Sequence, residues 1–321
     1  MSYFSNIMKQ VSSKEFLYFL LKLFVPVLLI YYLSVKFITI DSSIFKVNSI
    51  AFLAAGIALT FLNIYIQFLK WELLCNDYFG IKSRVEVIKS LLSGIAAGIF
   101  TPGRLGEFLG RSIILKKEKL GEVMLTTIYE KLLNQFWILY VGIVLVEIYA
   151  SEIYEIPKYF SIPLIIFTVA IIFIIMKYLK RFSLTDNQIE KATKKLPFLK
   201  KLLFNLYNTR RINPTLKRQL FGLSLILYIV IIVQYAFFVS SYLNGAEIIN
   251  YLWVGGLVIF ITTLIPSISI GDLGIREGAS VLILSSFGFS QQTGFNASLL
   301  LFCFNIFIPS VIGLYFLVRS K

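Results

Sequence analysis

Long apolar runs separated by short polar segments dominate the pattern of the chain. Six runs approach or exceed the roughly 20 residues that a helix needs to cross the hydrocarbon core of a bilayer. They predict an all-α, polytopic membrane protein with six full spans. These spans lie at about 16–35, 49–69, 122–149, 161–178, 219–241 and 293–318.

Two further apolar regions are interrupted near their middle. The first region, at about 85–117, is interrupted at Thr101-Pro102-Gly103. The second, at about 251–288, is interrupted between Pro266 and Gly274. Proline ends a helix, and glycine permits a tight turn. We therefore expect two re-entrant helical hairpins, which membranes tolerate where they are buried in protein or line a polar cavity. Two proline-kinked spanning helices, giving eight spans in all, are the alternative.

The two interrupted regions share a short motif. Gly103-Arg104-Leu105-Gly106 is followed 168 positions later by Gly271-Asp272-Leu273-Gly274, and each motif comes after a proline. The order of span, hairpin and span also occurs twice, over about 49–149 and 219–318. Because the span at 161–178 separates these halves, they have opposite orientations in the predicted topology. This is the pattern of an inverted-repeat transporter, whose binding site lies where the broken elements meet.

Polar residues inside the spans correspond weakly between the two halves. At an offset of 171 positions, Asn63 matches Gln234, and Asn134 matches Asn305.

The composition agrees with a membrane protein. The mean hydropathy is +0.81, and hydrophobic residues make up 58% of the chain while charged residues make up 15%. Soluble domains are about 45–50% apolar and about 25% charged. We therefore treat residues 1–321 as a single integral membrane domain.

One segment carries most of the net charge of +14. Residues 177–218 contain twelve basic residues and two acids, which amounts to +10. Such clusters mark cytoplasmic loops, so we expect a basic cytoplasmic loop and no nucleic-acid partner. With the other loops, this places both termini in the cytoplasm of a bacterial-type inner membrane. Residues 198–208 are expected to form an amphipathic helix on the inner leaflet.

The first interrupted region carries the densest group of candidate residues. Arg104, Glu107 and Arg111 share one helix face if a half-helix begins near Arg104. Arginine presents a fixed fork of donors to phosphate or carboxylate, and the free N–H groups at a helix start favour an anion. A charge at the bilayer centre costs at least about 2.5–3.5 kcal/mol, which favours a functional role. An interfacial loop with solvated charges is the alternative.

The second interrupted region carries a similar set of charges. We expect Asp272 to cap the second half-helix, and Arg276 and Glu277 to point to different sectors of it. The ion pairs predicted between the hairpins are Arg104 with Asp272 or Glu277, and Arg276 with Glu107.

Two polar segments lie inside or at the end of spans. Glu130 and Lys131 lie about two turns into their span, with Asn134 one turn further along. A buried polar site facing the hairpins and an interfacial ion pair with a snorkelling lysine are equally compatible with this pattern. Lys70-Trp71-Glu72 ends the preceding span, and we expect it to be an interfacial anchor.

The residue types exclude several chemistries. The chain has no histidine and two cysteines, which excludes histidine-based triads, HExxH zinc sites and disulfide frameworks. We predict neither a metal nor a cofactor, and no catalytic residue. The predicted substrate-binding residues are Arg104, Glu107, Arg111, Glu130, Asp272, Arg276 and Glu277. The predicted helix-break residues are Pro102, Gly103, Gly106, Pro266, Gly271 and Gly274.

These motifs resemble the membrane region of lysylphosphatidylglycerol synthase/flippase proteins and the related stand-alone flippase-like family. The resemblance covers about residues 50–315. The family often has Glu-Arg-x-x-Asp where this chain has Glu130-Lys131 and Asn134, and it often has Pro-Gly-Gly-x-Gly where this chain has Pro266 through Gly271. The matching segments are Pro102-Gly103-Arg104-Leu105-Gly106-Glu107, Glu130-Lys131-Leu132-Leu133-Asn134, Gly271-Asp272-Leu273-Gly274-Ile275-Arg276-Glu277 and Lys70-Trp71-Glu72-Leu73-Leu74.

The resemblance implies the lipid-handling membrane half without the soluble aminoacyl-transfer domain. We therefore expect a flippase that translocates an anionic phospholipid or a polyprenyl-phosphate-type lipid, and not an enzyme. The alternative is a membrane-embedded glycosyl- or lipid-transferase, or an accessory subunit, in envelope glycan or lipid assembly. A second copy of the chain or an envelope-assembly enzyme is the expected protein partner.

Overall fold

The computed structural model describes residues 46–99, 101, 104–115, 120–181, 213–243, 248–265 and 273–320. The described residues form helices and no strands, which confirms the all-α polytopic fold. Four helical segments in them are long and apolar enough to cross a membrane: 50–79, 120–153, 214–242 and 291–319. The predicted first span at 16–35 and the predicted amphipathic helix at 198–208 lie outside the described residues.

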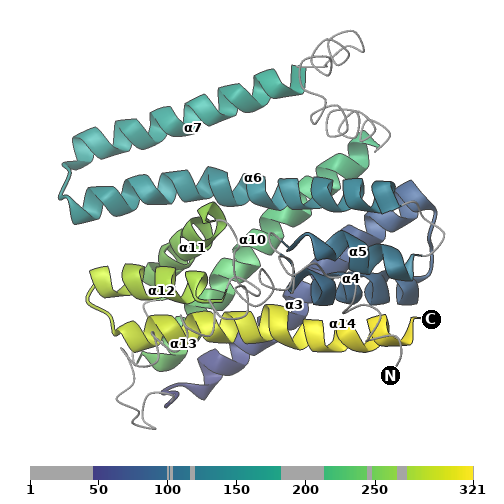
Figure 1. The fold of residues 1–321 in the computed structure, drawn as a ribbon. Coiled ribbons are helices and arrows are strands. Elements are labelled where there is room, and N and C mark those ends of the chain that lie inside the picture. Colours follow the sequence, from purple (N-terminus) through teal and green to yellow (C-terminus); the bar gives the residue numbers. More distant parts are fainter. Residues whose placement is uncertain are drawn as a thin grey trace, which may run out of the picture.

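Two antiparallel helices cross the middle of the molecule (Figure 1). They are α3 (Ile50–Leu74), which continues through a π-helical turn, η2 (Cys75–Phe79), and α10 (Pro214–Tyr242). The N–H of Asn48, just before α3, donates to the carbonyl of Ser241 near the end of α10, at 2.9 Å. Further along, Nε2 of Gln234 donates to the carbonyl of Gly56 at 3.1 Å. The paired positions run in opposite directions, so the helices are antiparallel.

The first interrupted region is a hairpin of α4 (Arg84–Ile99) and α5 (Gly106–Ile114). A Cβ on Gly106 would overlap the carbonyl oxygen of Ala97, and a Cβ on Gly110 would overlap that of Ser93. Position 106 therefore faces 97, while position 110 faces 93, which shows that the chain reverses between the two helices. Such close approach of two backbones requires glycine at these contacts.

The second interrupted region is a hairpin of α11 (Ile248–Leu264) and α12 (Ile275–Ser286). The Trp253 and Phe287 rings lie 4.7 Å apart, and the Tyr251 and Phe289 rings lie 5.5 Å apart. These pairs also run in opposite directions along the chain. Both interrupted regions are therefore hairpins, and the alternative of two kinked spanning helices is wrong.

The outer helices bracket the two hairpins (Figure 1). On one side lies α6 (Leu120–Ile153), with α7 (Lys158–Arg181) packed along it. On the other side, α13 (Gln291–Phe302), a second π-helical turn η6 (Cys303–Phe307) and α14 (Ile308–Arg319) form one continuous helix. The hairpin of α4 and α5 and the hairpin of α11 and α12 lie at opposite ends of the space between them.

The packing is reciprocal between the two halves. Helix α4 packs on α14, where Gly313 contacts the backbone of Leu92, and α11 packs on α6, where Gly142 contacts the ring of Phe260. The first arm of each hairpin thus packs on the last long helix of the other half. This reciprocity supports the predicted inverted halves, about 49–149 and 219–318, and the division itself stays a prediction.

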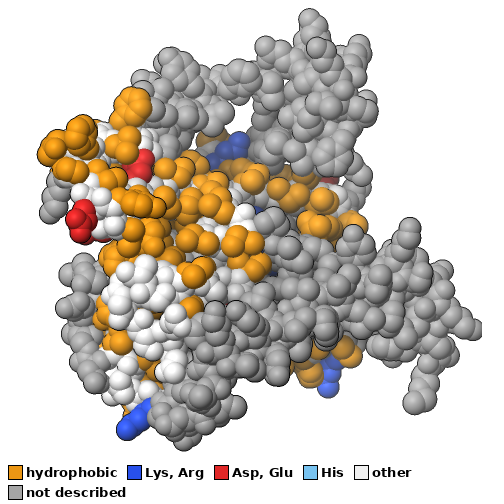
Figure 2. Space-filling view, turned by 60° about the vertical axis from the view of Figure 1, so that its left-hand side comes forward, with side chains coloured by type: hydrophobic (Ala, Val, Ile, Leu, Met, Phe, Trp, Pro, Cys, Tyr) orange, Lys and Arg blue, Asp and Glu red, His pale blue; other side chains and the backbone are white. Residues whose placement is uncertain are grey.

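The described surface is strongly apolar. Figure 2 shows hydrophobic side chains spread over most of the described surface in that view. Large side chains such as Phe61 of α3 and Ile166 of α7 are 74% and 63% exposed. Burial of apolar surface away from water is the main stabilising force of soluble proteins. An exposed surface of this kind is the one expected of a multi-pass membrane protein, whose outer face contacts lipid.

We expect Gly110→Ala to destabilise the protein, because the new Cβ would overlap the carbonyl of Ser93. Overpacking of this kind costs about 1–3 kcal/mol, and the thermal unfolding midpoint of the purified protein in detergent should fall. Gly121→Ala is the matched control, since no atom lies within 4 Å of its Cβ position. Equal midpoints for the two variants would contradict the close packing of the first hairpin.

Candidate functional site

Five charged side chains from three helices form a buried charge cluster: Lys70, Glu107, Arg111, Glu130 and Lys131. Lys70 comes from α3, Glu107 and Arg111 come from α5, and Glu130 and Lys131 come from α6. The cluster therefore joins the first hairpin to the helices that precede and follow it in the chain.

Arg111 lies at the centre of the cluster. Its Nη1 donates to Oε2 of Glu130 at 2.7 Å, and its Nη2 donates to Oε1 of Glu107 at 2.6 Å. The guanidinium lies over the Trp71 ring, with its carbon 4.2 Å from the ring centroid. The Arg111 side chain is 2% exposed, so these two carboxylates and the ring replace its hydration.

The first hairpin is built to accommodate this arginine. A Cβ on Gly94 of α4 would lie 2.6 Å from Cγ of Arg111, so the position has room only for glycine. Ser90, one turn earlier on α4, donates from its hydroxyl to the carbonyl of Arg111 at 3.1 Å. The same hydroxyl accepts the indole N–H of Trp71 at 3.3 Å. One serine thus fixes both the arginine backbone and the aromatic ring beneath its side chain.

Lys70 approaches Glu130 from the opposite direction. Its Nζ lies 3.7 Å from Oε1 of Glu130 and donates a hydrogen bond to Oδ1 of Asn134. Glu130 and Asn134 are one turn apart on α6 and so face the lysine together. Of the two interpretations of Glu130, the structure therefore selects the buried polar site that faces the hairpin. The prediction that Lys70-Trp71 is an interfacial anchor is wrong, because both side chains are fully buried.

Glu107 joins the centre of the cluster to its more exposed side. Its Oε1 accepts from Arg111, and its Oε2 lies 2.5 Å from Nζ of Lys131. The Lys131 side chain is 37% exposed, whereas that of Glu107 is 7% exposed. The ion pairs of Glu107 with described residues are those with Arg111 and Lys131, so the predicted pair with Arg276 is absent.

Arg104 precedes α5 instead of beginning it. Its φ of 56° is left-handed, and α5 begins at Gly106, two residues later than predicted. The N–H of Gly106 donates to the hydroxyl of Thr101 at 2.6 Å, which satisfies one free donor at the helix start. Arg104 lies close enough to Glu107 and Lys131 to interact electrostatically with both.

The cluster and Arg104 carry an excess of positive charge among the described residues. Lys70, Arg104, Arg111 and Lys131 stand against Glu107 and Glu130, which leaves two positive charges unbalanced. The Nε atoms of Arg104 and Arg111 are buried and have no hydrogen-bond partner in the described part of the chain. Buried cations are stable when paired, so this arrangement favours a bound anion.

In the second hairpin, Glu277 caps its own helix. It is 1% exposed, and its Oε2 accepts the N–H of Gly274 at 2.5 Å. Gly274 has a φ of 86°, which suits its predicted helix-break role. Arg276 is half-buried beside Glu277. The other predictions for this region concern Asp272, Pro266 and Gly271, which lie outside the described residues, as do Pro102 and Gly103 of the first hairpin.

The ends of the two hairpins meet beside a π-helical turn. Ile99, at the end of α4, packs in one hydrophobic cluster with Phe302 and Ile306, and Leu273, just before α12, packs against the same cluster. Ile306 belongs to η6, and π-helical turns occur frequently at functional sites. The two broken elements therefore converge, as the inverted-repeat interpretation predicts.

The polar residues that correspond between the two halves have different hydrogen-bond partners. Nδ2 of Asn305 donates to Oε1 of Gln234 at 2.7 Å, in the centre of the bundle. In the first half, Asn134 accepts from Lys70 instead, and Asn63 accepts from Gln67 at 2.6 Å. The amide pair of the second half therefore has no counterpart between Asn63 and Asn134.

Lys70, Trp71 and Lys131 belong to the site but are absent from the predicted substrate-binding residues. A lysine and a tryptophan near the end of a span are typical of an interfacial anchor. The signal that pointed to them was the resemblance of Lys70-Trp71-Glu72-Leu73-Leu74 to a family segment.

The fold and the cluster define a multi-pass helical membrane protein with a buried ionic site beside a helical hairpin. The chain belongs to the family of the lysylphosphatidylglycerol synthase TM region, whose model matches residues 19–313. Membership in this family indicates a lipid-related role in the membrane. No curated protein and no solved structure matches the chain.

We expect Glu130→Gln to be strongly destabilising, because it leaves Lys70 and Arg111 buried without their shared carboxylate. Breaking a buried pair in this way costs about 3–5 kcal/mol. Adding Lys70→Met should recover part of the loss, because it removes the cation that is left without a carboxylate, whereas Arg111 keeps Glu107.

The measurement is the thermal unfolding midpoint of the two single variants and the double variant in detergent. Glu122→Gln is the control on the same helix, since Glu122 lies in the first turn of α6 and is partly exposed. Additive effects of Lys70→Met and Glu130→Gln would refute a direct coupling between the two residues.

Proposed function

We propose that the protein is a flippase that translocates a lipid with an anionic phosphate head, either an anionic phospholipid or a polyprenyl-phosphate-type lipid. The observation that carries the proposal is the excess of two positive charges that the described residues place in and beside the buried charge cluster. A phosphate monoester would balance both charges and a phosphodiester would balance one of them, and the family's lipid-related role supports a lipid as the source of the phosphate.

The head enters on the side of Lys131 and Arg104. Lys131 is the most exposed cation of the cluster, and its neighbours in the chain include Leu132, which is 49% exposed. Leu105, next to Arg104, is 58% exposed. A charged opening bordered by lipid-facing leucines lets the phosphate reach the cations while the acyl or prenyl tails stay in the bilayer.

Translocation proceeds by exchange of ion-pair partners. The Lys131 ammonium leaves Glu107 for the phosphate, and Arg104 offers its Nε donor to it. Because Lys131 exchanges one anionic partner for another and Arg111 keeps Glu130, the step leaves neither of these cations unpaired in a low-dielectric environment. Glu130 keeps Arg111 in place during the exchange. The second hairpin, with Asp272, Arg276 and Glu277, receives the head on its way to the opposite leaflet.

The proposal also covers the membrane in which the protein resides and the side on which its termini lie. We place the protein in a bacterial-type inner membrane, and the basic loop at 177–218 supports the orientation with both termini in the cytoplasm. The exposed cations of the cluster then load lipid from the cytoplasmic half of the bilayer.

The test measures translocation of fluorescent phosphatidylglycerol and of a fluorescent polyprenyl phosphate in vesicles that contain the purified protein. Arg104→Gln should slow translocation by about tenfold or more, because a charge-assisted bond to phosphate contributes roughly 1.5–3 kcal/mol. It should leave the unfolding midpoint nearly unchanged, since Arg104 forms none of the ion pairs found among the described residues.

Arg218→Gln is the control with the same change in charge, because Arg218 is exposed near the start of α10. The proposal fails if the wild-type protein moves neither lipid, or if the two variants slow translocation equally.

A further inference from the structure

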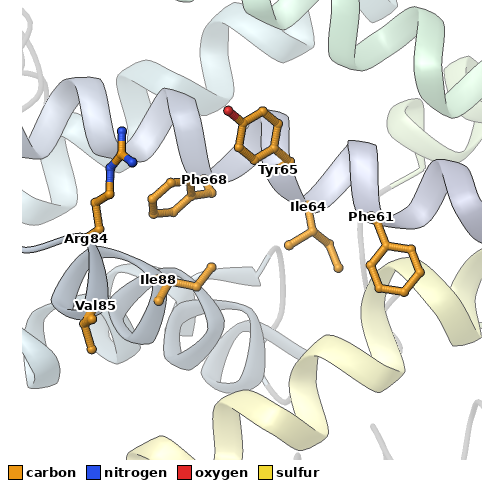
Figure 3. A pocket seen from close by; sticks show the side chains of 7 residues that line it. All are labelled: Phe61, Ile64, Tyr65, Phe68, Arg84, Val85 and Ile88. Carbon is orange, nitrogen blue, oxygen red and sulfur yellow. The ribbon is translucent and has the colours of Figure 1, made fainter.

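A groove of about 400 Å³ lies between α3 and α4 (Figure 3). Phe61, Tyr65 and Phe68 line it from α3, and Val85 and Ile88 line it from α4. These α3 residues recur every three or four positions and so occupy a face of the helix different from the face that carries Lys70. The groove and the buried charge cluster thus share α3 but no side chain.

The groove has one charged end and one apolar end. Figure 3 shows the guanidinium of Arg84 at one end and the ring of Phe61 at the other. Phe61 and Phe68 are seven positions apart and so lie about 10 Å from each other along α3. The lining between these ends is almost wholly apolar. A charged end followed by an apolar lining fits a phosphate head followed by an acyl chain.

Arg84 is held in position and keeps free donors. Its Nε donates to Oε1 of Glu72 at 2.7 Å, and its side chain is 78% exposed. Within the described residues this is its only hydrogen bond, so both Nη groups are available to a ligand. Glu72 neutralises the guanidinium overall. The end therefore selects a phosphate through the geometry of its donors and not through net charge.

We propose that this groove is a second lipid site, which holds one acyl chain of a phospholipid with its phosphate on Arg84. Helix α3 belongs to a segment that is long and apolar enough to span the membrane, so an exposed groove on its side opens to lipid. The bound chain packs α3 against α4, the hairpin arm that carries Ser90 and Gly94. The second site thus supports the first hairpin from outside and is separate from the proposed translocation route.

The test replaces exposed Val85 with the photo-crosslinking residue p-benzoylphenylalanine in the full-length protein. The protein is placed in vesicles of phosphatidylglycerol and digalactosyldiacylglycerol in equal amounts, which are both diacyl lipids but differ in phosphate. After irradiation, mass spectrometry of the intact protein and its peptides counts the adducts of each lipid. Phosphatidylglycerol adducts should exceed galactolipid adducts by about fivefold or more.

The ratio of phosphatidylglycerol adducts to galactolipid adducts should fall towards one in Arg84→Gln. It should stay unchanged in Lys82→Gln. Lys82 is an exposed basic residue two positions earlier that does not line the groove. Equal capture of the two lipids by the wild-type protein would overturn the proposal, whether or not Arg84→Gln folds. An unchanged preference in folded Arg84→Gln, or crosslinks to residues 1–45 of the same chain, would also overturn it. Because the readout is binding alone, it is independent of whether the protein translocates lipid.

Discussion

The burial of one guanidinium governs the arrangement of the first half of this protein. Arg111 is almost fully buried and would be prohibitively costly there without anionic partners. It obtains one carboxylate from its own helix, one from α6 and an aromatic face from α3. Three helices must therefore meet at this side chain, and α4 must carry Gly94 where the arginine passes it. Breaking a buried ion pair is costly because it leaves an uncompensated charge, so the cluster disfavours arrangements in which these helices separate.

The same interactions separate a structural part of the cluster from an adaptable part. Lys70, Arg111 and Glu130 are enclosed and hold the helices together. Lys131 pairs with Glu107 while remaining partly exposed. Arg104 precedes α5 and has a left-handed backbone conformation. A site that must release its ligand needs cations whose partners can change without loosening the fold. In this structure Lys131 and Arg104 can change partners without loosening the fold, whereas Arg111 cannot.

The sequence predicted the elements of this fold better than it predicted their contacts. Run length identified the spanning segments, and Pro102-Gly103 and Pro266 to Gly274 identified the two breaks, because these signals are local. The burial of Lys70 was not predictable from its own helix, where a lysine near the end is typical of an anchor. It depends on Glu130 and Asn134, about sixty positions away. The expected start of α5 at Arg104 failed for a local reason, since that residue adopts a left-handed backbone and Gly106 begins the helix.

The π-helical turn η6 affects how the helix of α13 and α14 packs on both hairpins. A π-helical turn accommodates an inserted residue, and one residue corresponds to a rotation of about 100° around a regular helix. Gly294 of α13 contacts the backbone of Ser280 on α12, and Gly313 of α14 contacts the backbone of Leu92 on α4. The inserted residue places these two contacts on the same side of the helix, where a regular helix would place them about 100° apart. Deleting one residue from Cys303–Phe307 would turn one contact away from its hairpin, and the helix would then match one hairpin only.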